Sequence, residues 1–219
     1  MLVFGQRAWR FSVLLLGAAS IVGIGCATIS LPPDAPDAAE KQYLPAAERG
    51  ELLSQYRLSM AYRFGTAGVP QNDALALRWL ESAAGGLTDA QMALGDVFAY
   101  GQLGQPKRAD DALRWWRKAA GQGDTDAQVY LAGQLEEGRV VAADLPEATR
   151  LYERAGRAGH RYARLKLARL IEAVAPEKAL GWFAAAGAAT DSERLRRRLS
   201  PEQLRRAEIF SATLRGDLK

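Results

Sequence analysis

Residues 109–123 decide the fold of this chain, and they read ADDALRWWRKAAGQG. Two other segments keep most of the apolar and small residues of this stretch in place. Residues 73–86 read DALALRWLESAAGG, and residues 145–159 read LPEATRLYERAGRAG. The segments recur about every 36 residues, and such a period is typical of proteins built from stacked repeats. We therefore expect one unit of structure that repeats along the chain.

Each repeat is expected to contain two helices, a first helix A and a second helix B. The predicted pairs of helices A and B are residues 51–64 and 72–84, 88–101 and 109–120, and 125–138 and 144–155, followed by a shorter unit at residues 161–187. In the first unit Leu53, Tyr56, Met60 and Phe64 form an apolar stripe at helical spacing. One unit cannot bury such a stripe alone, so the units must stack to form a core.

The composition agrees with an all-α protein. Hydrophobic residues make up 48% of the chain, which is enough for a sizeable core, and the 21 glycines suit turns between helices. A single cysteine forms no internal disulfide, and a single histidine supplies no zinc cluster. We expect no metal and no cofactor, so stability must come from helix packing.

The charge is unevenly placed along the chain. The formal net charge is +4, but residues 26–187 sum to −1 and residues 188–219 to +3. Because the body is nearly neutral and carries no base-stacking motif, we expect no nucleic-acid partner.

The N-terminus has the pattern of a secretory signal peptide. Arg7 and Arg10 precede a mostly apolar run at residues 11–24, which is short for a membrane span. We therefore expect residues 1–25 to act as a signal peptide and the chain to be exported.

The only cysteine lies where this signal peptide would end. Residues 22–26 read VGIGC and resemble the bacterial lipobox, although Gly23 stands where leucine is usual. The resemblance implies acylation of Cys26, and Ala27 favours the periplasmic side of the outer membrane. A soluble periplasmic protein and an uncleaved anchor are the alternatives. Residues 26–48 hold several prolines and are expected to form a flexible tether, or else an ordered strap along the first repeat.

The repeats resemble a known family. Residues 90–95 read AQMALG, and residues 112–123 fit the pattern A-x-x-W-[WY]-x-x-A-A-x-x-G; lapses include Ala132 and Leu151. Both patterns resemble Sel1-like repeats of the tetratricopeptide type. The resemblance implies a right-handed α-solenoid of about four repeats over residues 49–187. Residues 188–219 are expected to add a basic segment and a capping helix, which Ser200 begins with a capping box.

Catalytic groups do not converge in the sequence, and we predict that the protein is not an enzyme. His160 is interpreted as a turn residue and the Trp115–Trp116 pair as core rather than as a platform for a ligand. Acidic residues at the starts of helices B are interpreted as favourable to the helix dipole and as caps for free N–H groups. These residues are Asp73, Asp110, Asp111 and Asp144.

Sel1-like proteins serve as assembly platforms, so the resemblance implies a protein partner in the cell envelope and a scaffold function. We expect the partner in a groove on the helix A side, at positions Tyr56, Arg57, Gln91, Asp96, Gln128 and Gln134. An alternative is a cationic patch from Arg150 to Arg169 that binds an anionic polymer such as lipopolysaccharide or acidic exopolysaccharide. Its residues are Arg150, Arg154, Arg157, Arg161 and Arg164.

Overall fold

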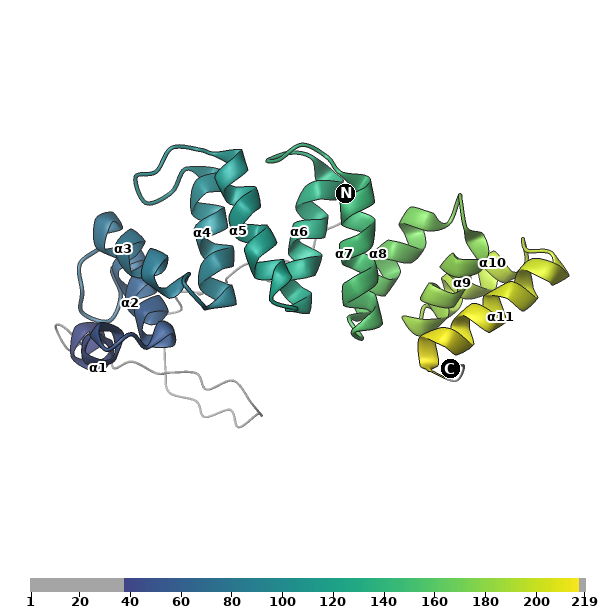
Figure 1. The fold of residues 1–219 in the computed structure, drawn as a ribbon, viewed down its shortest axis with the longest axis horizontal. Helices are drawn as coiled ribbons and strands as arrows, with labels where there is room; N and C mark the ends of the chain where they lie inside the picture. The colour runs from purple at the N-terminus through teal and green to yellow at the C-terminus, as the bar shows by residue number, and fades with distance from the viewer. Residues whose placement is uncertain (1–37, 217–219) are drawn as a thin grey trace, which may run out of the picture. The chain divides into compact units, whose positions relative to one another are not determined.

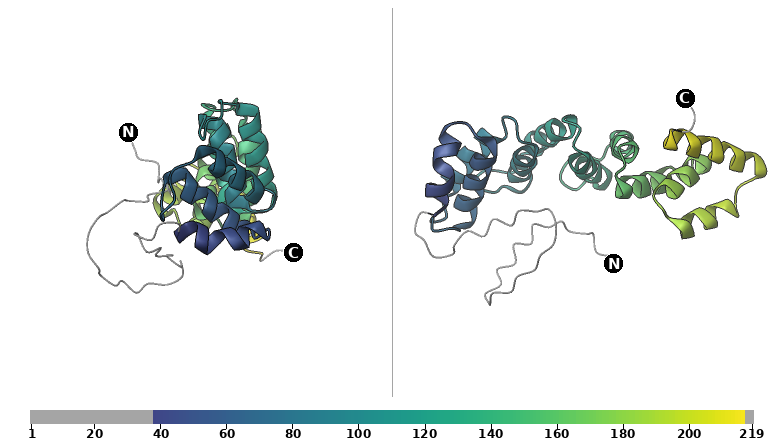
Figure 2. Two further views of the ribbon diagram at one scale, coloured as in Figure 1. Left: turned by 90° about the vertical axis from the view of Figure 1, so that its left-hand side faces the viewer. Right: turned by 90° about the horizontal axis from the view of Figure 1, so that it is seen from below.

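The structure, a computed structural model, describes residues 38–216 as a succession of α-helices (Figure 1). They are α1 (Ala38–Glu48), α2 (Leu52–Phe64), α3 (Asp73–Ala83), α4 (Thr88–Tyr100), α5 (Ala109–Gly121), α6 (Thr125–Glu137), α7 (Leu145–Arg157), α8 (Arg161–Ile171), α9 (Pro176–Ala185), α10 (Ala189–Arg196) and α11 (Pro201–Arg215). Each of α1 to α9 packs against the next helix along the chain, and Figure 2 shows this order from two other directions. The predicted all-helical solenoid is confirmed.

The predicted units agree closely with the observed helices. Helices A are α2, α4, α6 and α8, and helices B are α3, α5, α7 and α9. Three helices A end at a glycine in the left-handed region, Gly65 (φ 61°), Gly101 (φ 69°) and Gly138 (φ 66°). Glycine adopts this conformation without a steric penalty, which explains its recurrence at these ends.

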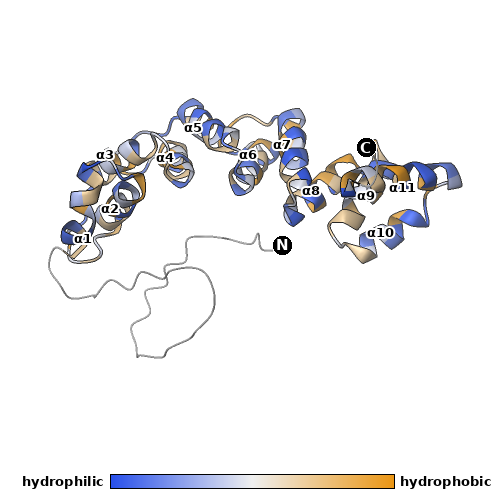
Figure 3. Cartoon of the chain, turned by 60° about the horizontal axis from the view of Figure 1, so that its bottom comes forward, coloured by the Kyte–Doolittle hydropathy of each residue, from blue (hydrophilic) through white to orange (hydrophobic). Residues whose placement is uncertain are grey.

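Bulky core side chains recur at one position on helix B. Leu80, Trp116, Tyr152 and Phe183 occupy this position in the four units, and each is at most 1% exposed. Small residues opposite make room for them: a Cβ atom on Gly95 would lie 2.4 Å from the Trp116 ring. In contrast, α5 and α7 display long hydrophilic stretches (Figure 3).

The apolar stripe predicted on α2 is partly wrong. Leu53 is 41% exposed and Phe64 is 53% exposed, although Tyr56 is buried. The buried side of α2 also contains Leu58 and Ala61, because this helix packs against helices on two sides, α1 and α3. A single apolar stripe covers contact with one neighbouring helix, whereas α2 needs a wider buried face to contact both α1 and α3.

Residues 38–48 differ from the expected flexible tether, because they form α1. Ala39, Tyr43 and Ala47 are buried against the first repeat, and the Ala39 amide donates to Ala67 O at 3.0 Å. These residues repeat the helix B pattern, with Tyr43 at the position of Trp116. Pro45 lies within this helix and does not end it. Thus α1 is the helix B of a preceding unit.

The C-terminal helices close the array. Ser200 and Gln203 form the predicted capping box at the start of α11. The helix packs on α9, where the Phe210 ring meets Trp182 edge-on with centroids 5.8 Å apart. A capping helix of this kind covers the last apolar surface of a solenoid.

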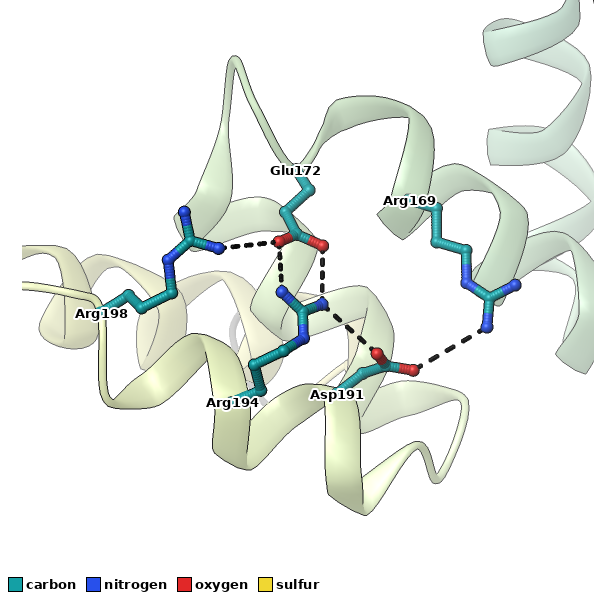
Figure 4. A network of polar contacts seen from close by, with 5 residues as sticks. All are labelled: Arg169, Glu172, Asp191, Arg194 and Arg198. Carbon is teal, nitrogen blue, oxygen red and sulfur yellow. Dashed lines mark hydrogen bonds and ion pairs between the residues drawn. The ribbon is translucent and has the colours of Figure 1, made fainter.

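A group of charged side chains joins α10 to the end of α8 (Figure 4). Glu172 accepts two hydrogen bonds from Arg194, at 2.6 and 2.8 Å, and Arg198 lies 3.5 Å away. Asp191 lies between Arg194 and Arg169. Arg194 lowers the pKa of the Glu172 carboxyl. Several arginines of the basic segment are therefore engaged within the chain.

The predicted signal peptide and Cys26 lie outside the described residues. Over residues 38–216, none of the helices is both long and apolar enough to cross a membrane.

Candidate functional site

Two of the predicted groove residues belong to the packing between units. Gln91 is 0% exposed, and its Nε2 donates to Ala84 O at 3.0 Å, at the end of the preceding helix B. Gln128 is 3% exposed and donates to Ala120 O in the same way. Their burial excludes Gln91 and Gln128 from an open groove surface.

The same junction recurs between other units. Gln55 donates from Nε2 to Ala47 O at 2.9 Å, and Arg164 donates from Nε to Gly156 O at 2.7 Å. Each donor lies seven or eight residues after its carbonyl. The carbonyls at the end of a helix have no partner within the helix. A side chain from the next helix A therefore satisfies this need at each junction.

Asp96 connects three successive helices. Its Oδ1 accepts hydrogen bonds from Trp116 Nε1 at 3.2 Å and from the Tyr130 hydroxyl at 2.7 Å. Burial raises the pKa of the Asp96 carboxyl, and the two hydrogen bonds oppose that rise. Burial and the nearby Asp96 together raise the pKa of Tyr130. Asp96 thus links α4 to α5 and α6, and it lies at the edge of the surface formed by helices A.

The remaining predicted groove residues have different surroundings. Tyr56 is buried, and burial is the main cause that raises the pKa of its hydroxyl. Arg57 lies over the Tyr43 ring, 5.6 Å from its centroid, and so packs toward α1. Gln134 is half-buried on α6. The six predicted residues therefore do not form one surface.

A different surface emerges from the outward residues of α4 and α6. Neither helix carries a lysine or arginine, whereas together they carry five carboxylates. We call the outward residues the acidic face. They are Asp89, Met92, Asp96 and Tyr100 on α4, and Asp126, Val129, Tyr130, Gly133, Gln134 and Glu137 on α6. The Tyr130 to Asp96 hydrogen bond shows that the two halves are adjacent.

Carboxylates gather where these helices begin. Asp89 lies at the start of α4, and partial burial of its carboxyl together with the nearby Asp124 and Asp126 raises the pKa of that carboxyl. Asp124 caps α6 by accepting from the Ala127 amide at 2.7 Å. Sequence reasoning missed Asp89, Asp126 and Tyr100. The absence of lysine and arginine from two successive helices A is the signal that would have found them.

His160 lies beside this cluster and has the structural role expected of it. Its Nδ1 accepts from the Ala163 amide at 3.2 Å and so caps α8. Because Nδ1 is the acceptor, the neutral ring carries its proton on Nε2, which lies 3.1 Å from Asp126 Oδ1. His160 therefore ties the start of α8 to the start of α6.

Most of the predicted cationic patch is engaged within the protein. Arg157 pairs with Glu153 at 2.7 Å, and Arg161 and Arg164 donate to carbonyls near the end of α9 at 2.8 and 2.7 Å. Arg150 and Arg154 are exposed and make no side-chain hydrogen bond or ion pair within residues 38–216. Two of the five predicted arginines, Arg150 and Arg154, thus remain available to bind an anionic ligand.

The helix-start aspartates and the Trp115–Trp116 pair, considered above as candidate ligand-binding residues, lie at helix starts or pack within the array. Asp144 caps α7 by accepting from the Glu147 amide, and Asn72 rather than Asp73 caps α3. Trp116 is 0% exposed, and its neighbour Trp115 is half-buried below Lys118. Within residues 38–216, no three histidine, cysteine, aspartate or glutamate residues gather as metal ligands.

One depression combines two loops far apart in the sequence. It has a volume of about 360 Å³ and lies between the loop after α2 and the loop after α4. Arg63 donates to Gln102 Oε1 at 2.5 Å across it, and the exposed Phe64 forms part of its wall. No short sequence pattern marks such a site, because its residues meet only after the units stack.

The stacked pairs of helices and their repeated junctions define an α-solenoid of short helical repeats. Family comparison matches the Sel1 repeat at residues 52–85, 88–124 and 125–160. The chain therefore belongs to the Sel1 repeat proteins. In the structure the helical pattern continues beyond the matched residues into α1, α8 and α9.

Two solved structures support this assignment. A Sel1 repeat protein from Oxalobacter formigenes is 37% identical, with a TM-score of 0.51; the match covers 58% of this chain and 95% of that one. A protective antigen of uropathogenic Escherichia coli strains, which displays an SLR fold, is 28% identical over 81% of this chain, with a TM-score of 0.60. The chain spans 40% of the length of that antigen. A search of curated proteins finds no match.

Proposed function

We propose that this protein is a non-enzymatic scaffold that binds a protein partner through the acidic face. Sel1 repeat proteins generally mediate protein–protein interactions and are typically non-catalytic. The observation that carries the proposal is the exposed combination of carboxylates and aromatic rings on two successive helices A. Tyr100 is 44% exposed at one end of this face, and Asp126 is 65% exposed at the other.

Site-specific crosslinking tests this proposal. A photo-crosslinking amino acid would replace Tyr100 on the acidic face or, as a control, Arg150 on the helix B surface of α7. We expect a discrete protein adduct from position 100 and none from position 150. No adduct from position 100, or equal adducts from both positions, would contradict the proposal.

We further propose that the scaffold acts in the cell envelope, on the periplasmic side of the outer membrane, anchored by lipid at Cys26. This address is supported by the signal-peptide pattern of residues 1–25 and by the likeness of residues 22–26 to a lipobox. Metabolic labelling with a fatty acid tests it. Label on the wild type and none on Cys26→Ser is expected, whereas no label, or equal label on both, would overturn the anchor.

Binding of an anionic envelope polymer through residues 150–169 has less support. Arg157, Arg161 and Arg164 already make hydrogen bonds or ion pairs within the chain. A polymer contact would also weaken steeply as salt is added. Lipopolysaccharide binding that Arg150→Ala together with Arg154→Ala abolishes would favour this second function.

A further inference from the structure

Two loops of the array share one conformation. The loop after α2 reads GTAGVPQ at residues 65–71, and the loop after α4 reads GQLGQPK at residues 101–107. Ala67 (φ 55°) and Leu103 (φ 51°) occupy equivalent positions in them, and within residues 38–216 these are the only non-glycine residues with a positive φ. A non-glycine residue in this region carries backbone strain, which persists only where the surrounding structure holds it. Both loops are therefore fixed in shape.

Each loop is held by equivalent contacts. The Asn72 amide donates to Tyr62 O at 2.9 Å, and the Arg108 amide donates to Phe98 O at 2.8 Å. A proline near the end of each loop further restricts the backbone, because its ring fixes φ. The loop after α6 has neither a proline nor a non-glycine residue with a positive φ. Among the described loops, this conformation is thus confined to the two that border the depression described above.

Polar groups line this depression, which we call the loop cavity. Its lining residues are Arg63, Phe64, Gln71, Asp73, Gln102 and Leu103. Its volume of about 360 Å³ lies in the range of small-molecule sites, about 300–1,000 Å³. The Oε1 atom of Gln102 accepts from Arg63, whereas its Nε2 donates to no group within residues 38–216. Asp73 likewise forms no ion pair in this part of the chain. The loop cavity therefore offers unused donors and acceptors to a ligand.

The formal charges of the loop cavity balance, because Arg63 supplies one positive charge and Asp73 one negative charge. A charged ligand would meet a like charge in the cavity, and like charges repel at short range. An uncharged polar ligand avoids this repulsion. The Gln71 and Gln102 amides suit such a ligand, because each amide group both donates and accepts hydrogen bonds. The lining thus favours a neutral ligand rich in polar groups.

Phe64 adds an apolar surface to this polar lining. Its ring is 53% exposed at the end of α2, and the Arg63 guanidinium lies 5.2 Å from the ring centroid. A pyranose sugar matches both properties, because its C–H groups can pack on an aromatic ring while its hydroxyls donate and accept hydrogen bonds. A helical peptide would require a row of apolar contacts along a groove, whereas the loop cavity presents one exposed ring. A sugar is therefore the better match.

We infer that the loop cavity binds a neutral hexose unit of a glycan, with the sugar ring packed on Phe64 and its hydroxyl groups bonded to Asp73 and Gln102. The inference goes beyond the proposed protein interface, because none of the lining residues belongs to the acidic face. It also differs from the cationic patch, which would select an acidic polymer. A protein with both surfaces would hold a glycan and a protein partner on one array.

Glycan binding to the full chain tests the inference. The probes are immobilised oligosaccharides that end in glucose, galactose or mannose, or in glucuronic acid, and calorimetric titration then measures the affinity of the best neutral one. The test variant is Phe64→Ala, and Phe64→Trp restores an aromatic face. The matched control is Tyr100→Ala, because Tyr100 ends α4 as Phe64 ends α2, is 44% exposed and lies outside the loop cavity.

We expect oligosaccharides that end in a neutral hexose to bind, Phe64→Ala to weaken that binding about tenfold, and Phe64→Trp and Tyr100→Ala to change it less than about threefold. Binding of no neutral oligosaccharide, a preference for chains that end in glucuronic acid, or equal losses in Phe64→Ala and Tyr100→Ala would overturn the inference. Circular dichroism of each variant shows whether the helices are retained.

An aromatic photo-crosslinking amino acid at position 64 distinguishes a glycan from a peptide in the loop cavity. We expect an adduct that stains for carbohydrate when the full chain is irradiated with the best-bound oligosaccharide. Capture of a protein segment in place of the glycan would overturn the inference and assign the loop cavity to a protein partner.

Discussion

The indole nitrogen of Trp116 donates to Asp96 Oδ1 across 3.2 Å, and this contact joins a fully buried core side chain to a carboxylate of the acidic face. The stability of the array and the shape of the acidic face therefore depend on the same pair. A partner bound at α4 and α6 would contact a surface whose position is fixed from beneath by the core.

Replacement of Trp116 by alanine should destabilise the array strongly. The side chain is 0% exposed, and truncation of such a core residue typically costs about 3–5 kcal/mol. Trp115→Ala is the matched control, because that neighbouring ring is only half-buried; we expect a cost of about 1–2 kcal/mol there. Urea denaturation followed by circular dichroism would measure both, and equal losses would show that Trp116 is not the core residue described.

Replacement of Gly95 by alanine should also destabilise, although alanine favours helices. The added Cβ would lie 2.4 Å from both Cδ1 and Nε1 of Trp116, so the ring must move at a cost of about 1–3 kcal/mol. Gly133→Ala places its Cβ 3.7 Å from the Tyr152 hydroxyl, an ordinary contact. That control should stabilise by up to about 1 kcal/mol. Opposite signs in thermal melting are expected; equal effects would contradict the packing.

The charge on Asp96 should make stability depend on pH. Burial raises the pKa of this carboxyl above its usual value near 3.8, so the folded state holds the proton at pH values where the unfolded state has lost it. Stability therefore falls as pH rises through this window. Asp96→Asn does not titrate, so its free energy of unfolding should gain on the wild type as pH increases from about 4. A constant difference across this range would refute the burial effect.

The role of α1 can be tested at Tyr43, which is 4% exposed. Tyr43→Ala should cost about 3 kcal/mol if α1 is an integral helix of the array. Lys41→Ala, on the exposed side of the same helix, should change stability by less than about 0.5 kcal/mol. A near-neutral effect of Tyr43→Ala would instead indicate that α1 packs loosely.

The sequence predicted the helices well because their signals are local. The copies of Trp116 and the glycines that end helices A recur at a nearly fixed spacing, and a fixed spacing survives small lapses. Residues 39–50 also match residues 112–123 in sequence, but Pro45 made a helix seem unfavourable there. For α1, the repeat spacing was a better predictor of a helix than the low helix propensity of proline.

The surface was harder to predict because exposure depends on which helices pack together. Gln91 and Gln128 are polar and were expected to face a groove, yet each is buried because the end of the preceding helix B needs a donor. Arg164 likewise resembled a surface cation and instead bridges Gly156 and Ala185. Whether a polar side chain in such an array is exposed or buried can be predicted only once the backbone carbonyl that it bonds is known.

The recurrent junction of Gln55, Gln91, Gln128 and Arg164 has an evolutionary consequence. Because each donor reaches a backbone carbonyl, which every residue possesses, the connection places no demand on the side chains of the neighbouring unit. Duplication or loss of a unit would regenerate the same connection without compensating changes. The length of such a protein can therefore change independently of the residues that choose its partner.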